Sequence, residues 1–386
     1  MAWSGSKRII PPDPCHSSLR DRNPPKIIHR IARLSSAQAR RRAAGELIEA
    51  GSLRTPIASE ASALFLYKGE AESHVFVVGD FNSWDTRASP MIQVPGTGLF
   101  WLEVDLPPDS RVEYKFVVDG EWSLDPLNPS IITGKFGSNS VLAMPRYEEP
   151  EEVPAQAEAY CAARKLTLKS RALGSTWEVR VRSPLGVPLE GLMVVLGGED
   201  YLEYGKIDRI TDGMISSGRV RPFVTALVDP REAHAGYEMA RSCCDFVADE
   251  LIPFLRDETG TPPDRGQTAV LGAGYGGLIS LLSALTFPDA IGKAAVQSGY
   301  LTGTWHGTIM ESISALRKTP SIYMDCGAFE TSVGDRGSAL HASRDIEAAL
   351  RSRGCRVLYV ETREGHNWTA WKARLPRALE FLYGAG

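Results

Sequence analysis

A glycine-rich turn, a glutamate and a histidine are the residues of this chain whose types and order point to acyl chemistry. The turn is Gly272-Ala273-Gly274-Tyr275-Gly276, the carboxylate is Glu330 and the imidazole is His366. A carboxylate that orients a histidine makes the imidazole a general base, which ordinarily activates a serine at the centre of a G-x-S-x-G turn. Gly274 stands at that centre, so the sequence predicts the base and its acid without the nucleophilic oxygen.

Each of these segments follows a predicted strand. The strand 268–271 and a helix from residue 276 enclose the turn, which is the strand–turn–helix context that a nucleophile elbow requires. The strand 321–324 precedes Glu330, and the last strand, 356–360, precedes the loop that contains His366. Asp325 follows the same strand as Glu330 and remains the second candidate for the acid.

Backbone amides near the turn are expected to stabilise a developing oxyanion. The segment 194–201 follows an early strand, and the N–H groups of Glu199 and Tyr275 are the predicted donors. The predicted substrate-pocket residues are Asp200, Trp368 and Trp305. The tryptophans among them are equally compatible with packing in the core.

Strands and helices alternate from residue 161 to residue 386. This alternation predicts an α/β fold, in which helices cover both faces of a mostly parallel sheet. The predicted strands are 177–181, 192–196, 224–228, 268–271, 294–296, 321–324 and 356–360, and helices are predicted over 238–257, 276–286 and 341–353.

The first 160 residues have a different pattern. Short β-type runs separated by turn signals predict an immunoglobulin-like all-β sandwich over residues 60–146, with strands at 63–67, 75–78, 100–104 and 114–118. Residues 147–160 are acidic and contain proline, which is typical of a linker. Residues 1–59 are expected to form a basic N-terminal arm, up to residue 35, and a helix at 36–51, while the α/β domain spans 161–386.

The sandwich carries aromatic residues that give it a family resemblance. The stretches 78–84, 114–122 and 125–129 resemble the glycogen-binding module of the AMP-activated kinase β subunit and of branching enzymes. The resemblance implies that Trp84 and Trp122 stack on sugar rings. It also implies that Lys115 and Asn139 bond the sugar hydroxyls. The alternative is a structural role for these residues, or a module that only shields an active site.

The α/β domain resembles the enterochelin (ferric siderophore) esterase and esterase-D group of α/β-hydrolases. Besides the turn, the resemblance rests on Glu199-Asp200-Tyr201, Val228-Asp229-Pro230, Gln297-Ser298-Gly299 and Gly365-His366-Asn367-Trp368. It implies an ester substrate of the siderophore or natural-product type and no cofactor. Two positions depart from the family's pattern. Gly274 replaces the serine, and Gly197 stands where an aspartate commonly precedes the glycine of the oxyanion segment.

Gly274 supports three hypotheses. In the first, His366, Glu330 and the oxyanion hole act on an ester or related acyl substrate without a covalent acyl-enzyme. In the second, the chain is a pseudo-esterase that binds a ligand or carbohydrate and turns nothing over. In the third, the glycine is an engineered replacement that inactivates a serine esterase. A phosphate-binding turn and a substitute thiol are both disfavoured, the first by its spacing and the second by the cysteine positions.

Composition disfavours several classes of function. The 386 residues carry a net charge of −4, with 43% hydrophobic and 23% charged residues, which is ordinary for a globular protein. No apolar run is long enough to cross a bilayer and no signal-peptide pattern begins the chain, so a cytoplasmic location without a membrane partner is expected. The six cysteines lack metal-ligand spacing, so reduced thiols and no metal are expected. No nucleic-acid-binding motif accompanies the Arg-rich residues 1–54, and assembly into a homo-oligomer is left open.

Overall fold

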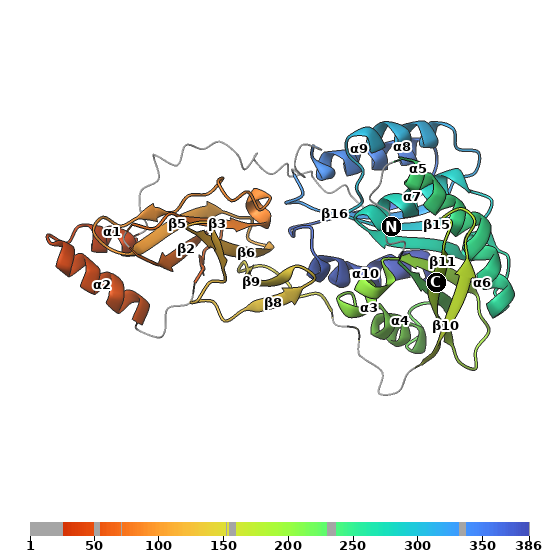
Figure 1. Ribbon diagram of the computed structural model, residues 1–386, viewed down its shortest axis with the longest axis horizontal. Helices are drawn as coiled ribbons and strands as arrows, with labels where there is room; N and C mark the ends of the chain where they lie inside the picture. The colour runs from red at the N-terminus through yellow and green to blue at the C-terminus, as the bar shows by residue number, and fades with distance from the viewer. Residues whose placement is uncertain are drawn as a thin grey trace, which may run out of the picture. The chain divides into compact units, whose positions relative to one another are not determined.

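The computed structural model describes residues 26–49, 55–70, 72–151, 153, 160–229, 237–331 and 337–385 (Figure 1). The chain divides into two compact units. The first runs to Ile132 and includes Ser138–Tyr147, and the second comprises Thr133–Gly137 and the residues from Glu148 onward. The first unit consists mainly of strands, whereas strands and helices alternate in the second.

Two sheets form the first unit. One has the strand order β1-β2-β5-β4, and the other has the order β3-β6-β9-β8 with β7 paired to β6. The strands are β1(Ile57–Ala58), β2(Ser62–Lys68), β3(Val75–Gly79), β4(Ile92–Gln93), β5(Leu99–Asp105), β6(Arg111–Val118), β7(Glu121–Ser123), β8(Ile131–Gly134) and β9(Gly137–Ala143), and a 3-10 turn, η1(Asp80–Asn82), follows β3. The predicted all-β sandwich is confirmed.

Aromatic side chains from the two sheets meet in the core of the sandwich. Phe65 of β2 lies against Tyr114 of β6 with ring centroids 4.9 Å apart, and Tyr67 lies against Phe116 at 5.0 Å. Successive side chains of a strand point to opposite faces of its sheet. Lys115, between Tyr114 and Phe116, therefore points away from this core.

The residues before the sandwich are helical and pack on its first sheet. They form α1(Lys26–Ala32) and α2(Ala37–Glu49). Ile28, Ile31 and Ala44 belong to one apolar cluster with Leu66 and Trp101. The prediction of an arm up to residue 35 is therefore wrong for α1, where apolar residues at helical spacing bury one face. Residues 1–25 of that arm lie outside the described residues.

An eight-stranded sheet is the centre of the second unit. Its order is β10-β11-β13-β12-β14-β15-β16-β17. Neighbouring strands from β13 to β17 are parallel, whereas β10 and β11 add an antiparallel edge. The strands are β10(Cys161–Lys169), β11(Thr176–Pro184), β12(Gly191–Leu196), β13(Phe223–Val228), β14(Thr268–Ala273), β15(Lys293–Gln297), β16(Ser321–Gly327) and β17(Arg356–Thr362). All but β10 overlap a predicted strand.

Helices cover both faces of this sheet (Figure 1). They are α3(Gly198–Glu203), α4(Ile207–Ser216), α5(Tyr237–Asp245), the π-helical turn η2(Phe246–Leu251), α6(Ile252–Thr259), the 3-10 turn η3(Arg265–Gln267), α7(Tyr275–Thr286), α8(Thr304–Ser314), α9(Ala339–Ser352) and α10(Trp368–Tyr383). One apolar cluster joins the sheet to α5 through α9, and another joins it to α3, α4 and α10. The predicted α/β fold with helices on both faces is confirmed.

Candidate active site

A sharp turn at Gly274 joins β14 to α7. Gly274 has φ 56° and ψ −116°, a conformation that L side chains adopt only with strain. Its N–H donates to Gln297 O at 2.9 Å and its carbonyl accepts from Tyr300 N–H at 3.0 Å, which ties the turn to the end of β15. Gly272 permits the close crossing of α7 over β14, because a Cβ there would lie 2.3 Å from the Gly276 carbonyl carbon. The turn has the geometry of a nucleophile elbow.

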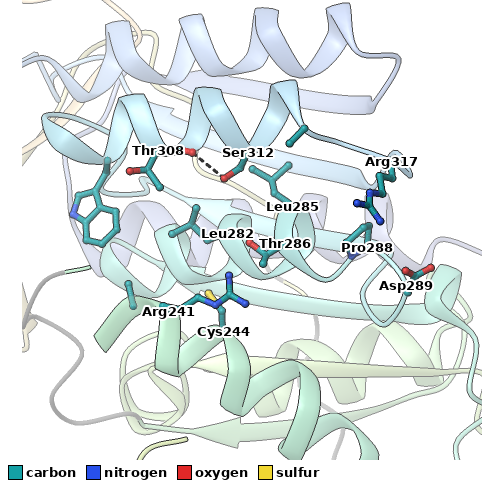
Figure 2. Close-up of a pocket in the computed structure, with 13 residues that line it drawn as sticks. Arg241, Cys244, Leu282, Leu285, Thr286, Pro288, Asp289, Thr308, Ser312 and Arg317 are labelled. Carbon is teal, nitrogen blue, oxygen red and sulfur yellow. Dashed lines mark hydrogen bonds between the residues drawn. The ribbon is translucent and has the colours of Figure 1, made fainter. Parts of the chain in front are cut away.

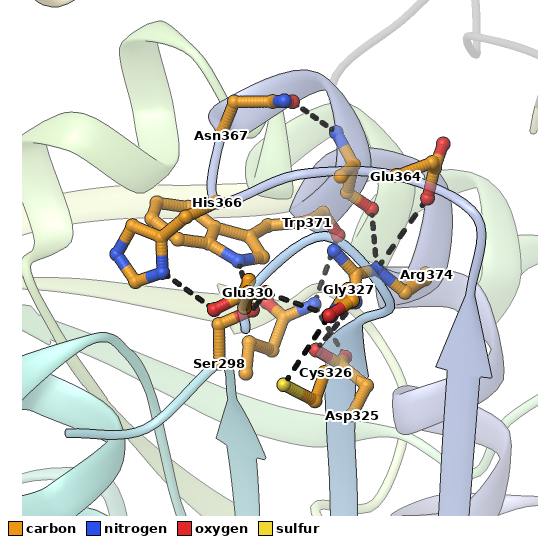
Figure 3. A network of polar contacts seen from close by, with 12 residues as sticks. Ser298, Asp325, Cys326, Gly327, Glu330, Glu364, His366, Asn367, Trp371 and Arg374 are labelled. Carbon is orange, nitrogen blue, oxygen red and sulfur yellow. Dashed lines mark hydrogen bonds and ion pairs between the residues drawn. The ribbon is translucent and has the colours of Figure 1, made fainter. Parts of the chain in front are cut away.

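His366 and Glu330 form a pair beside this turn (Figure 3). His366 Nδ1 lies 2.8 Å from Glu330 Oε2, and the Glu330 side chain is only 2% exposed, whereas that of His366 is 32% exposed. The other ring nitrogen, Nε2, lies 3.7 Å from the position that a Cβ on Gly274 would occupy. The structure therefore brings the three predicted catalytic positions together in the order Glu330, His366, Gly274.

Electrostatics favour the ionised form of Glu330. Burial by itself would raise the pKa of this carboxyl group. The charge of His366, hydrogen bonds from His366 and Ser298, and the charge of Arg374 outweigh burial and lower the pKa below its ordinary value. An ionised Glu330 accepts a hydrogen bond from Nδ1 of His366 in either protonation state of the ring. In the neutral imidazole, Nε2 is then the proton acceptor on the side of Gly274.

Asp325, the second candidate for the acid, has different partners. Its Oδ1 lies 3.0 Å from Arg374 Nη1, and its Oδ2 accepts from Gln297 Nε2 at 3.2 Å. Burial raises the pKa of Asp325, and Arg374 opposes that rise. Of the two candidate carboxylates, Glu330 is the one that hydrogen bonds to His366.

The two predicted oxyanion donors have different surroundings. Tyr275 follows Gly274 and begins α7, so its N–H lies at the positive end of the helix dipole. Glu199 lies in α3, and its N–H donates to Asp229 Oδ2 at 3.0 Å. Burial raises the pKa of Asp229 above its ordinary value, and this hydrogen bond only partly opposes the rise. The sequence did not predict this hydrogen bond. The Glu199 N–H already has an acceptor, Asp229, within the protein.

The three predicted pocket residues lie on three different helices. Trp368 begins α10 and packs edge-to-face on Tyr201, with ring centroids 5.0 Å apart, beside the apolar cluster under α10. Asp200 lies on α3, close enough to Asp229 for their charges to interact. Trp305 lies on α8 and packs edge-to-face on Tyr275 at 6.4 Å.

Trp305 also lines a groove formed by residues of α5, α7 and α8 (Figure 2). The groove has a volume of about 400 Å³, and Arg241 and Arg317 are among the residues that line it. None of the three predicted catalytic positions lines it. This groove is therefore not the predicted pocket, in which Trp305 would lie beside the catalytic positions.

The cysteines among the described residues are buried free thiols. Burial raises the pKa of Cys243 to about 11 and that of Cys244 to about 12. Cys326 on β16 is fully buried, which raises its pKa well above the ordinary value. Because the thiolate is the nucleophile, thiols with raised pKa values are poor substitutes for the missing serine. Cys15 lies outside the described residues.

Within the described ranges, no helix combines the length and the apolar character needed to traverse a bilayer. The same ranges contain no group of three or more His, Cys, Asp or Glu side chains that could hold a metal ion.

The four predicted carbohydrate residues lie on or next to β6 of the first unit. The rings of Trp84 and Trp122 are 6.3 Å apart at an angle of 35°, and Trp122 is 49% exposed. Lys115 Nζ lies 6.0 Å from the centroid of the Trp122 ring. Asn139 donates to Glu113 Oε2 at 2.8 Å. Trp84, Lys115 and Trp122 thus form one aromatic and cationic face.

Several residues around His366 received no role from the sequence. Tyr300 stacks on His366 with a centroid distance of 5.7 Å and an interplanar angle of 14°. Ser298 and Arg374 also had no predicted role, and Trp371 was expected only to line an aromatic pocket or to pack in the core (Figure 3). One usable signal was the segment 297–299 at the end of a strand. The other was the three-residue spacing of Trp371 and Arg374, which places both on one side of the last helix.

Known protein families match both units. The family model for esterases matches residues 170–382. A model described as the glycogen recognition site of AMP-activated protein kinase matches residues 62–142. The 5′-AMP-activated protein kinase subunit beta-2 of Homo sapiens is 35% identical over 69 residues, which are 18% of this chain and 24% of that protein.

Individual relatives are distant. The iron(III) enterobactin esterase of Escherichia coli strain K12 is 23% identical over 204 residues, 50% of this chain and 49% of that protein. An endo-1,4-beta-xylanase/feruloyl esterase of Xylanibacter ruminicola is 24% identical over 331 residues, 77% of this chain and 42% of that protein. The crystal structure of an enterobactin esterase from Shigella flexneri in the presence of enterobactin has a TM-score of 0.65 and 20% identity, over 84% of this chain and 94% of that chain. This last likeness shows the fold.

Proposed function

Because the chain belongs to the Esterase family, we propose that it hydrolyses an ester or related acyl substrate without forming an acyl-enzyme. In this proposal His366 is the general base, Glu330 orients it, and the Tyr275 N–H contributes to stabilising the oxyanion. A water molecule takes the place that a serine hydroxyl would have at Gly274. Similarity to the iron(III) enterobactin esterase of Escherichia coli favours an ester of the siderophore or natural-product type.

The proposed reaction is a direct hydrolysis in two steps. First, His366 Nε2 removes a proton from the water, and the hydroxide adds to the ester carbonyl carbon, whose oxygen becomes the oxyanion. Then the bond to the alcohol oxygen breaks, and the leaving alkoxide takes the proton from His366. Glu330 stays ionised and stabilises the imidazolium between the two steps. One ester and one water give one acid and one alcohol.

The distance between His366 and Gly274 is the observation that carries this proposal. The three atoms nearest to a Cβ on Gly274 lie at 3.7 to 3.8 Å, and His366 Nε2 is one of them. An oxygen placed one covalent bond beyond that position, toward the imidazole, is within hydrogen-bonding reach of Nε2. Serine proteases without triad members retain roughly 10³–10⁴-fold catalysis over water, so turnover well below that of a serine esterase is expected.

A short-chain ester assay on the native chain and two variants tests the proposal. Gly274→Ala and Gly274→Ser are a matched pair, because both place a Cβ at the same positive φ. Gly274→Ala occupies the space of the water and is expected to abolish native turnover. Gly274→Ser supplies a nucleophile and is expected to raise turnover. His366→Ala is expected to be inactive in both backgrounds.

Two results would overturn direct hydrolysis. If the native chain is inert toward every ester tried while Gly274→Ser is active, the chain is a pseudo-esterase that binds without turnover. If His366→Ala keeps the native rate, His366 is not the base.

A second function, glycan binding by the first unit, is supported by the face that Trp84 and Trp122 form. A pyranose ring has an apolar side that packs on an aromatic ring, and Lys115 and Asn139 offer donors for hydroxyl groups. The match of residues 62–142 to a glycogen recognition site supports the same function.

Retention on immobilised glycogen or starch tests glycan binding. Trp84→Ala and Trp122→Ala are each expected to weaken retention at least about tenfold, because each removes a large apolar contact. Ile131→Ala is the control, since Ile131 on β8 is 50% exposed and Trp122 is 49% exposed. Equal retention of the native chain and the two tryptophan variants would dispose of sugar binding at this face.

A further inference from the structure

Trp371 and Ser298 form a hydrogen-bonded chain that ends on Glu330 (Figure 3). Trp371 Nε1 lies 2.9 Å from Ser298 Oγ, which in turn lies 2.6 Å from Glu330 Oε1. An indole N–H only donates, so it occupies a lone pair of the Ser298 hydroxyl and leaves the hydroxyl proton for the carboxylate. The direction of donation is therefore from Trp371 to Ser298 and from Ser298 to Glu330.

Both ends of this hydrogen-bonded series, Glu330 and Trp371, contact His366. Glu330 Oε2 bonds His366 Nδ1 at 2.8 Å, and the Trp371 ring lies edge-to-face against the His366 ring with centroids 4.8 Å apart. Ser298, Glu330 and Trp371 are buried, at 1%, 3% and 7% exposure. The four side chains form a closed loop of contacts, of which only His366 faces solvent to a large extent.

Ser298 has a backbone conformation that serine rarely adopts. Its φ is 45°, in the left-handed region that favours glycine. Its N–H donates to Asp325 O at 2.9 Å, which ties it to the neighbouring strand. Glycine would relieve the strain at this position but would remove the hydroxyl. Strained residues persist where the surrounding structure fixes them, and they concentrate at functional sites.

We propose that Ser298 and Trp371 are positioning residues for the Glu330–His366 pair. Glu330 Oε1 accepts from Ser298 and also from the Gly327 N–H at 2.7 Å. Rotation of the carboxylate would break both bonds, so Oε2 stays directed at Nδ1. The imidazole tautomer with its proton on Nδ1 is then the stable one, and Nε2 is the proton acceptor.

This inference rests on the proposed function, but the tautomer of His366 is measurable without a substrate. In an NMR spectrum of the full chain, a low-field and slowly exchanging Nδ1 proton is expected for His366. Its loss in Glu330→Gln identifies the resonance. Ser298→Ala and Ser298→Gly form the test pair, since both lack the hydroxyl while only the alanine keeps a Cβ at the strained φ.

Both Ser298 variants are expected to lose this resonance by broadening or to shift it upfield. Losing the hydrogen bond from Ser298, which lowers the pKa of Glu330, is also expected to raise that pKa. If a weakened resonance remains in a variant, it is therefore expected to disappear on acidification at a higher pH than it does in the native chain. Trp371→Phe keeps an aromatic ring beside His366 but lacks the N–H, and it is expected to give a smaller change in the same direction.

The proposal would be overturned if the resonance kept its native position and width in both Ser298 variants and disappeared at the same pH as in the native chain on acidification. If Ser298→Ala does not fold, Ser298→Gly and Trp371→Phe still decide the question. Failure of the proposed function gives a different result. In that case the native chain hydrolyses no ester, while the Ser298 variants still change the His366 resonance.

Discussion

Arg374 and Asp325 form a buried ion pair in which Nη1 and Oδ1 lie 3.0 Å apart. The Arg374 side chain is 4% exposed, and its Nε lies 3.8 Å from a carboxylate oxygen of Glu364. Its charge also contributes to lowering the pKa of Glu330. One guanidinium therefore compensates two buried carboxylates and favours the ionised form of a third. This explains how Asp325, only five residues before Glu330 in sequence, can serve a different role.

Arg374→Met is expected to destabilise the chain by about 3–5 kcal/mol, because it leaves buried carboxylates without a compensating charge. The measurement is the free energy of unfolding from urea denaturation. Arg344→Met is the control, since the Arg344–Glu361 pair is 36% and 32% exposed. Partly exposed pairs contribute about 0–1 kcal/mol. An equal loss of unfolding free energy in the two variants would mean that the buried Arg374 pair contributes no more to stability than a partly exposed pair.

Glu330→Gln and Asp325→Asn distinguish the two carboxylates. Glu330→Gln removes the charge that orients His366, and a fall in kcat of roughly 10²–10⁴ with little change in KM is expected. Asp325→Asn is expected to lower the stability, because it leaves the Arg374 charge buried with less compensation. Both rates are measured in the native chain and in the Gly274→Ser background. A fall in kcat for Asp325→Asn equal to that for Glu330→Gln, at native stability, would contradict the assignment of the acid to Glu330.

The order of the elbow, the acid and the histidine was predictable because each follows a strand of a parallel sheet. The side chains that fix the acid and the histidine in place were not predictable. Ser298 and Trp371 are 73 residues apart in sequence, and no local pattern specifies which tryptophan reaches which hydroxyl. The hydrogen bond from the Glu199 amide in α3 to Asp229, which follows β13, likewise joins separate segments, and periodicity does not reveal it.

The fold itself followed from local patterns in most places. Buried strands such as β12 and β13 have continuous apolar sequences, which is typical of parallel strands covered on both faces. β10 was not predicted, because most of its side chains are exposed and it lies at the sheet edge. α1 was not predicted, because its seven residues give too short a pattern and its stability comes from packing on the sandwich.

Asp80 is expected to make the stability of the first unit depend on pH. This buried carboxylate accepts from Trp84 Nε1 at 3.1 Å and from the Glu113 N–H at 2.8 Å. Burial and then the charge of Glu113 raise the pKa of Asp80 to about 7, while the charge of Arg111 opposes the rise. A pKa that is higher in the folded state gives stability at low pH, which is lost as the pH rises through the folded value. Between pH 5 and pH 8, a loss on the order of 1–3 kcal/mol is expected.

Hydrogen exchange of the full chain measures this effect. Amides of β6 are expected to exchange more readily at pH 8 than at pH 5 after correction for the intrinsic rates, whereas β14 in the second unit serves as an internal reference. Asp80→Asn removes the titrating group and is expected to abolish the difference between the two pH values. An unchanged difference in Asp80→Asn would assign the pH dependence to another residue.

Gly272 and Gly274 are expected to respond very differently to an added methyl group. A Cβ on Gly272 would lie 2.3 Å from the carbonyl carbon and 2.5 Å from the oxygen of Gly276, so the backbone of the elbow must move. Gly272→Ala is therefore expected to destabilise the chain by more than about 3 kcal/mol. Gly274→Ala meets no atom closer than 3.7 Å, so only the strain of its positive φ, about 1–3 kcal/mol, is expected.

Gly303→Ala measures the backbone strain for this comparison. Gly303 has φ 63° and ψ −135°, close to the values at Gly274, and no atom lies within 4 Å of an added Cβ, so this variant measures the cost of the backbone conformation alone. Urea denaturation should place the destabilisation of Gly274→Ala within about 1 kcal/mol of that of Gly303→Ala. A much larger cost at Gly274 would mean that the space beside His366 is closed to even one carbon atom. The proposed water would then have no room there, and direct hydrolysis would lose its physical basis.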